Sequence, residues 1–185
     1  MAESSEIRVR HDQLEAFLLA LFAAAGLSQQ DAAWHARALV LSNLWGIDSH
    51  GALRAPIYLQ RLRSRVVNPT PAIRALRGAG AYEILDGDDG SGFIVGRKAM
   101  ERAIALAEQF SVGMVGVVRS NHFGAAALYA RLAVERGMCG VALTSVSPNI
   151  VAPGGKQPIV GNNPIAIAIP TGLDFPFCLD MSLSA

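Results

Sequence analysis

The sequence predicts an α/β fold in which an N-terminal helical segment, residues 1–70, precedes a mixed-sheet domain, residues 71–185. Apolar residues recur at helical spacing in the first segment. From residue 82 to residue 145, strand-like apolar runs alternate with helical stretches, as is typical of α/β proteins. Two later strand-like runs have no helix between them, so at least part of the sheet is expected to be antiparallel or mixed.

Three helices are expected in the first segment. The first runs from about Leu14 and ends at Gly26. Ser28 and Asp31 have the spacing of a capping box, which would open a second helix that reaches about Leu44. Pro56 favours a first helical turn, and the third helix should therefore run from there to about residue 64. Residues 68–71 then read as a rigid, extended linker.

The second segment combines short strands with two helices. The expected strands are 72–76, 82–85, 112–118, 139–145, 165–169 and 175–179, and the expected helices are 94–109 and 125–136. Residues 86–92 are interpreted as a turn. A Gly-rich dinucleotide loop would suit this place, but the glycine spacing is wrong and three aspartates would repel a pyrophosphate.

Composition excludes several classes of protein. The chain of 185 residues is 51% hydrophobic with a net charge of +1, which argues against disorder. It has no basic patch interleaved with aromatic residues, so nucleic acid is not expected as a partner. The composition does not exclude a small anionic substrate, because one arginine in a cleft is enough to bind it. The four histidines lack metal-ligand spacing, and no metal is predicted.

Location is predicted from cysteine use and hydropathy. Cys139 and Cys178 lie in apolar runs and are interpreted as two reduced, buried thiols, which suits the cytoplasm. The first six residues are acidic and polar, unlike a signal peptide. No apolar run approaches the roughly twenty residues that span a membrane.

His122 is the first candidate for chemistry. It follows an apolar strand-like run and precedes a helical pattern, with Ser120 and Asn121 before it. Strand ends of this kind often carry the chemistry of α/β proteins, and imidazole moves protons near neutral pH. The alternative is that His122 only caps the following helix or fills a turn.

Three other groups are candidates. Arg54 lies four residues after His50, so the two can face the same way, the arginine holding a carboxylate and the imidazole a hydroxyl. Asp180 ends a strand and could orient an imidazole or bind a cofactor amide. Residues 161–164, Gly-Asn-Asn-Pro, could hold an amide or hydroxyl. The alternative for Arg54 and His50 is a surface arginine beside a capping histidine. For Asp180 it is a turn carboxylate, and for residues 161–164 it is a plain turn.

Four ordered motifs together resemble the malate/L-lactate dehydrogenase family of the non-Rossmann type. They are Ser49-His50-Gly51-x-x-Arg54-x-Pro56-x-Tyr58, then Ser120-Asn121-His122-Phe123-Gly124 with Tyr129, then Gly161-Asn162-Asn163-Pro164, then Asp180-Met181. The resemblance runs from the first helix to the last residue, and the four motifs are specific only in combination.

The resemblance implies an enzyme that binds NAD or NADP through an unusual fold, and a homodimer with its active site near the subunit interface. His122 matches the proton acceptor or donor, His50 with Ser49 a substrate-side pair, and Asp180 a residue near the nicotinamide. Arg54 and Asn121 are the candidates for binding the substrate. The candidates for contacting the cofactor are Ser120, His122, Thr144, Ser145, Ser147, Gly161, Asn162, Asn163, Pro164, Asp180, Met181 and Ser182.

Two departures from the family pattern matter. Family members often have Asp-Met-Ala-Thr-Ser where residues 180–184 read Asp-Met-Ser-Leu-Ser, so one small cofactor contact is lost. Family members also continue well beyond this point, and the chain is therefore expected to be part of a longer protein.

The predicted function is an NAD(P)-dependent oxidoreductase that interconverts a 2-hydroxy acid and a 2-keto acid, with His122 as acid and base. Two alternatives stay open. One is a reductase of a cyclic imino acid, and the other is a truncated, non-catalytic fragment that retains only dimerisation or ligand binding.

Overall fold

The computed structural model describes residues 8–183 of the chain. The expectations about a signal peptide in the first six residues and about Ser184 lie outside the described residues. The chain divides into two compact units, Met1–Pro71 and Ala72–Ala185, and each is described by itself.

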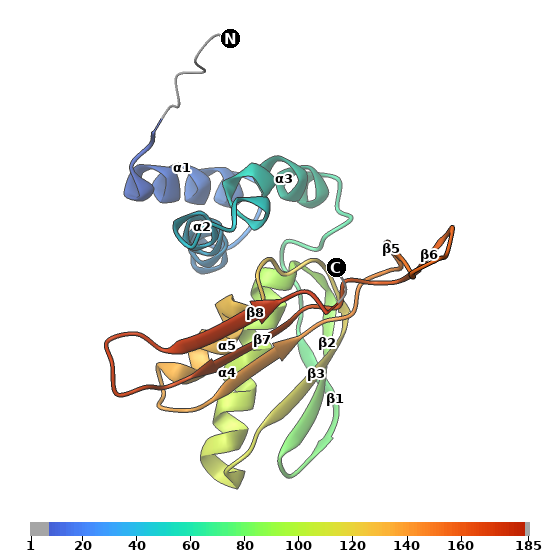
Figure 1. The fold of residues 1–185 in the computed structure, drawn as a ribbon. Coiled ribbons are helices and arrows are strands. Elements are labelled where there is room, and N and C mark those ends of the chain that lie inside the picture. Colours follow the sequence, from blue (N-terminus) through green and yellow to red (C-terminus); the bar gives the residue numbers. More distant parts are fainter. Residues whose placement is uncertain (1–7, 184–185) are drawn as a thin grey trace. The chain divides into compact units, whose positions relative to one another are not determined.

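The first unit is helical, as predicted. Ser28 begins the second helix: its Oγ accepts a hydrogen bond from the Asp31 backbone N–H (3.1 Å) and donates one to Asp31 Oδ2 (2.7 Å). Pro56 lies in the first turn of the third helix. Figure 1 labels the helices α1 (His11–Ala24), α2 (Gln29–Leu44) and α3 (Ala55–Arg63). Two short 3₁₀ turns, η1 (Asp48–His50) and η2 (Ala52–Arg54), lie between α2 and α3.

His35 lies in the core of this unit and is only 1% exposed. Its ring lies 4.1 Å from the ring of Phe22 and 5.4 Å from that of Tyr58, measured between centroids. Burial disfavours the charged imidazolium and lowers the pKa of His35 to about 3. Burial likewise raises the pKa of Tyr58 to about 12. His35 is therefore a packing residue that is kept neutral.

The second unit contains two three-stranded sheets and a small hairpin. In the first sheet β1 pairs antiparallel with β2, and β2 pairs parallel with β3. In the second sheet β7 lies between β4 and β8 and is antiparallel to both. The strands are β1 (Arg74–Ala79), β2 (Tyr82–Gly90), β3 (Met114–Ser120), β4 (Gly140–Leu143), β5 (Ile150–Val151), β6 (Pro158–Val160), β7 (Ile165–Ile169) and β8 (Phe177–Met181).

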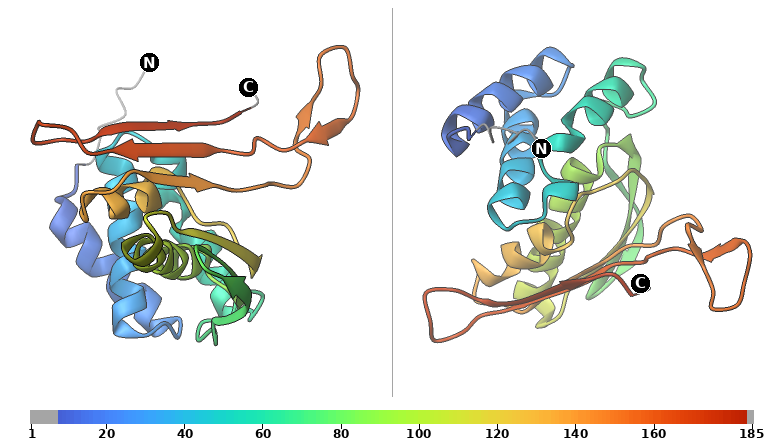
Figure 2. Two further views of the ribbon diagram at one scale, coloured as in Figure 1. Left: turned by 90° about the horizontal axis from the view of Figure 1, so that it is seen from below. Right: turned by 45° about the horizontal axis from the view of Figure 1, so that its top comes forward.

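Two helices, α4 (Gly92–Phe110) and α5 (Ala127–Val134), lie between the two sheets (Figure 2). Helix α4 packs against β2 and β3, while α5 packs against β4 and β7. Ala166 and Ala168 of β7 are fully buried, and these small side chains let α5 approach the sheet closely. The predicted α/β fold with mixed strand directions is thus confirmed. Among the described residues, no helix is long and apolar enough to cross a membrane.

Three predictions about this unit were wrong. Residues 86–90 continue β2 instead of forming a turn. The pairing register with β3 shifts between Asp86 and Gly90, as at a β-bulge, and within this stretch the Asp86 carboxylate accepts the Asp88 backbone N–H (3.0 Å). Cys139 and Cys178 are free thiols, but both are exposed, Cys178 because β8 is an edge strand. The segment between β4 and β7, expected as a loop, contains the β5–β6 hairpin.

Replacing His35 with Leu should remove a pH dependence from stability. The unfolded chain protonates this histidine near its ordinary pKa of 6.5, whereas the folded chain does so only near 3. The unfolded state therefore binds more protons between these values, and the folding constant should fall by up to roughly tenfold per pH unit as pH drops through this window.

Urea unfolding of the wild type, His35→Leu and His11→Leu across that window tests this prediction. The exposed His11 is the matched control, and its variant should keep the wild-type slope. An unchanged slope in His35→Leu would contradict the prediction.

Candidate active site

The loop that carries His122 is tied to the end of the neighbouring strand. Strands β2 and β3 run parallel, and Gly90 pairs with Ser120 at their carboxyl ends. The Asn121 side-chain amide donates hydrogen bonds to the carbonyl oxygens of Asp89 (2.9 Å) and Gly90 (3.1 Å). The exposed His122 accepts a bond at Nδ1 from the Gly124 backbone N–H (3.3 Å). The candidate histidine thus lies just beyond a strand end, as predicted, and that strand belongs to a parallel pair.

Close packing against α4 and α5 fixes the path of this loop. A Cβ on Gly92 would lie 2.6 Å from the His122 carbonyl oxygen and closer still to that of Asn121, so only glycine fits at the start of α4. The buried Tyr129 of α5 donates to the carbonyl oxygens of Phe123 and Gly92, and its ring stacks on Phe123 at 4.8 Å.

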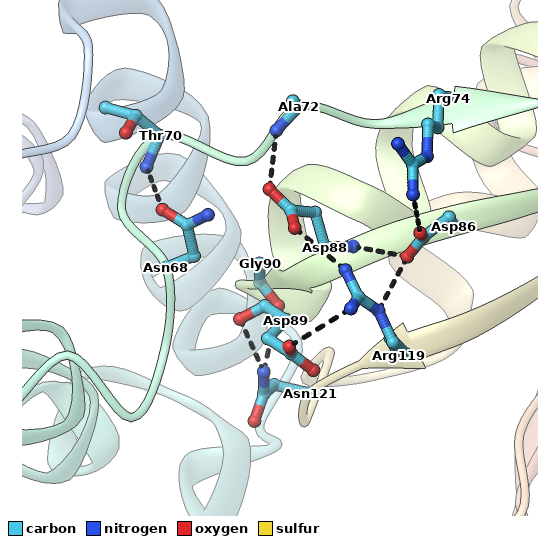
Figure 3. A network of polar contacts seen from close by, with 10 residues as sticks. All are labelled: Asn68, Thr70, Ala72, Arg74, Asp86, Asp88, Asp89, Gly90, Arg119 and Asn121. Atoms are coloured by element: carbon cyan, nitrogen blue, oxygen red, sulfur yellow. Dashed lines mark hydrogen bonds and ion pairs between the residues drawn. The ribbon is translucent and has the colours of Figure 1, made fainter.

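Sequence reasoning missed a charge network next to this loop (Figure 3). Arg119 Nε donates to Asp86 Oδ1 (2.8 Å), and its terminal nitrogen donates to Asp88 Oδ1 (2.8 Å). Arg74 lies 3.3 Å from Asp86 Oδ2. The Asp88 backbone N–H and Arg119 hold the pKa of Asp86 below its ordinary value. The signal was present, because Asp86 and Arg119 each follow an apolar strand run.

Asp180 joins the same loop from the second sheet. Its Oδ2 accepts the backbone N–H of Ala127, the first residue of α5, at 2.8 Å. No side chain of Ala126 can cap this helix, so the carboxylate on β8 serves as its acceptor. The turn 124–127 therefore donates one N–H to His122 and another to Asp180, which brings both predicted residues to one turn.

The predicted cofactor segments meet at one end of the second sheet. Leu143 pairs with Ile165, and Ile165 pairs with Met181, so the residues just beyond these positions lie together. Four hydrogen bonds join them: Thr144 N–H to Pro164 O (3.3 Å), Val146 N–H to Asn163 Oδ1 (3.0 Å), Ser182 Oγ to Asn162 O (3.2 Å), and Leu183 N–H to Asn162 O (2.9 Å). Ser145 and Ser147 are exposed in the loop that follows β4.

Asn162 offers an acceptor to a ligand. Its side-chain oxygen Oδ1 is buried and has no hydrogen-bond partner among residues 8–183. A buried polar atom of this kind is costly unless something donates to it. The carboxamide of a nicotinamide is one group that carries such a donor.

The first unit holds the other predicted residues. Ser49 Oγ lies 3.0 Å from His50 Nδ1, and Arg54 Nε donates to the Ser49 carbonyl oxygen (2.8 Å). Sequence reasoning missed Asn43, which donates to Asp48 Oδ1 and accepts the Ala52 backbone N–H (2.8 Å). No carboxylate of the described residues pairs with the exposed Arg54. The structure brings Ser49, His50 and Arg54 together within this unit, and His122 and Asp180 within the other.

Known proteins match almost the whole chain. The family model described as malate/L-lactate dehydrogenase matches residues 9–185. A malate dehydrogenase from Pyrococcus abyssi is 39% identical over 182 residues, which are 98% of this chain and 50% of that protein. An L-sulfolactate dehydrogenase from Methanocaldococcus jannaschii is 40% identical over 160 residues, 86% of this chain and 46% of that protein.

Solved structures agree with these matches. The malate dehydrogenase from Pyrococcus horikoshii superposes with a TM-score of 0.93 at 40% identity, covering 98% of this chain and 52% of that chain. The chain therefore spans about half the length of the relatives it matches.

Two further relatives have a cofactor in their names. They are a ureidoglycolate dehydrogenase (NAD(+)) from Escherichia coli, 34% identical over 85% of this chain and 45% of that protein, and a (2R)-3-sulfolactate dehydrogenase (NADP(+)) from Chromohalobacter salexigens, 34% identical over 93% of this chain and 51% of that protein.

Replacing Gly92 with Ala should destabilise the second unit by about 1–3 kcal/mol, because the added Cβ would clash with the backbone of the His122 loop. Gly172→Ala is the matched control, since a Cβ there meets nothing within 4 Å. It should change the free energy of unfolding by less than about 0.5 kcal/mol. Urea unfolding measures both variants, and equal stabilities would show that Gly92 does not constrain the loop.

Proposed function

The chain belongs to the malate/L-lactate dehydrogenase family, and from this we propose that the full-length protein is an NAD(P)-dependent oxidoreductase of small 2-hydroxy acids. The observation that supports the proposal most is the turn 124–127, whose backbone N–H groups bind both His122 and Asp180. An imidazole and a carboxylate held by one turn are suited to handling a proton at a fixed place.

In this proposal His122 exchanges a proton with the oxygen on C2 of the substrate. When bound, NAD(P) would supply or accept the hydride at C2 of the substrate. In the reducing direction, protonated His122 would give a proton to the keto oxygen as the C–H bond forms, and in the oxidising direction the neutral ring would take it back. The bond from the Gly124 backbone N–H to Nδ1 exists only while that nitrogen is unprotonated. Asp180 holds the start of α5 and with it the turn that orients the imidazole.

Arg54 is proposed to bind the substrate carboxylate, with Ser49 and His50 beside it. Its Nε is engaged by the Ser49 carbonyl oxygen, which fixes the direction of the guanidinium and leaves the geometry of its terminal nitrogens suited to a bidentate pair. The two hydrogen bonds of Asn121 favour a role in holding the loop. Substrate contact through Asn121 stays a prediction.

We propose that the cofactor lies against the sheet end formed by residues 144–147, 161–164 and 180–182, where Asn162 Oδ1 would accept from its carboxamide. The choice between NAD and NADP, the homodimer, the cytoplasmic location and reduction of a cyclic imino acid stay predictions. A panel of 2-hydroxy acids and cyclic imines, run with both cofactors on the full-length protein, separates the two reactions.

Replacing His122 with Ala in the full-length protein should lower turnover at least about a hundredfold, because the acid and base is lost. Affinity for NADH, measured by fluorescence quenching, should be kept. His11→Ala, on the exposed surface of α1, is the control and should leave turnover unchanged. Near-normal turnover of His122→Ala would exclude this residue as the proton donor.

Replacing Asn162 with Ala should weaken NADH binding to the full-length protein by about tenfold, since the cofactor carboxamide loses its acceptor. Asn149→Ala, at an exposed position just before β5, serves as the control. Fluorescence titration gives both dissociation constants. If the two variants bind NADH equally well, Asn162 is not a cofactor contact.

A further inference from the structure

Asn43, in the last turn of α2, holds the segment that carries the substrate-side candidates of the first unit. Its side-chain NH₂ group donates to Asp48 Oδ1, and its Oδ1 accepts the Ala52 backbone N–H (2.8 Å). Asp48 is the first residue of the turn η1, and Ala52 is the first residue of η2. A single amide group therefore holds the start of each turn.

The end of α2 places Asn43 beside these turns. The chain leaves the helix through Gly46, whose φ angle of 76° is common for the glycine that ends a helix, and both turns pack back on α2. Asparagine is a poor helix former, because its side chain competes for nearby backbone groups. In the last turn of α2 the same tendency lets its side chain bind the backbone of the segment that follows.

Gly51, between the two turns, leaves the room that the Asn43 side chain occupies. A Cβ on Gly51 would lie 2.6 Å from Asn43 Nδ2 and closer still to Oδ1, which is too close for any two such atoms. Because the amide is hydrogen-bonded at both ends, it could not turn away from that Cβ without losing these bonds. The amide and the glycine therefore fit only together.

The direction of Arg54 depends on both turns. Arg54 ends η2, and its Nε donates to the carbonyl oxygen of Ser49 in η1 (2.8 Å). A shift of one turn relative to the other would move the guanidinium away from this acceptor. Bidentate binding of a carboxylate needs the two terminal nitrogens in a fixed place, and a misplacement of about 1 Å is costly.

We propose that Asn43 is a positioning residue for recognition of the substrate carboxylate, and that it acts through Arg54. The inference rests on the function proposed above for Arg54. Both ends of the Asn43 amide are used within the unit, so its effect is on the two turns. Loss of these bonds should weaken binding of the acid and leave binding of NADH, proposed to lie on the second unit, unchanged.

Reversing the hydrogen bond in the full-length protein tests this inference. In Asn43→Asp two carboxylates face each other and η1 loses its donor, so KM for the acid should rise at least about tenfold. In the double variant Asn43→Asp/Asp48→Asn the donor lies on residue 48 and the acceptor on residue 43. KM should then return to within about threefold of the wild-type value, because the two substitutions are coupled.

Asn68→Ala is the matched control. Asn68 Oδ1 also accepts a backbone N–H, that of Thr70 (3.0 Å), but outside the segment from Asp48 to Arg54. This variant should keep the wild-type KM. Initial rates with malate and with 3-sulfolactate, the acids in the names of the relatives, give KM and kcat, and fluorescence quenching gives the dissociation constant of NADH.

The split between KM and kcat separates positioning from a general effect on folding. A smaller folded fraction lowers kcat and leaves KM as it was. An Asn43→Asp protein with a KM within about twofold of the wild type would overturn the inference, as would a double variant no better than the single one. Should Asn43→Asp fail to fold, Asp48→Ala removes the same hydrogen bond at an exposed position, and a wild-type KM there has the same meaning.

Arg54→Ala distinguishes this inference from the function on which it rests. If Arg54→Ala raises KM and Asn43→Asp does not, Arg54 binds the acid without help from Asn43 and the inference alone is wrong. If Arg54→Ala keeps the wild-type KM, the substrate role of Arg54 is wrong and the inference fails with it.

Discussion

The second unit depends on one buried contact, the junction of Tyr129 with the starts of α4 and of the His122 loop. Tyr129 is 2% exposed, and a hydroxyl so deeply buried is costly unless it is hydrogen-bonded. Here it donates to the carbonyl oxygens of Phe123 and Gly92. A Cβ on Gly96 would lie 2.8 Å from the tyrosine ring, so that position too excludes a side chain. The place of His122 is therefore set by core packing rather than by its own exposed loop.

Charge holds the other side of this loop in an uncommon conformation. Arg119, Asp88 and Asp89 have φ angles of 52°, 50° and 54°, values that non-glycine residues rarely adopt. Such conformations persist only where surrounding contacts stabilise them, and the ion pairs of Arg119 with Asp86 and Asp88 do so here (Figure 3). Because the pKa of Asp86 is lowered, this stabilisation is present above the ordinary carboxyl pKa and fades as pH falls through the lowered value.

The sequence predicted what local patterns encode and missed what depends on distant partners. Helices α1 to α5 were predicted because apolar spacing, Ser28 and Pro56 are local signals. The four motifs contain most of the candidate residues. In the second unit the structure gathers them at the turn 124–127 and at one end of the second sheet, and in the first unit around Ser49. Residues 86–90 were mistaken for a turn because their aspartates are satisfied by Arg119, some thirty residues away. The exposure of Cys178 depends on β8 having a single partner strand, which composition does not reveal.

The alternation along β7 links the candidate site to the opposite face of the second sheet. Its alanines let α5 pack closely, and the register that pairs Ala166 with Asp180 brings that carboxylate to the N-terminus of α5. Its isoleucines point to the opposite face of the sheet. Among the described strands, β8 pairs with β7 alone, so packing on the isoleucines of β7 also stabilises the strand that carries Asp180. The position of the candidate carboxylate, and through the turn 124–127 that of His122, is thereby coupled to packing on the opposite side of the sheet.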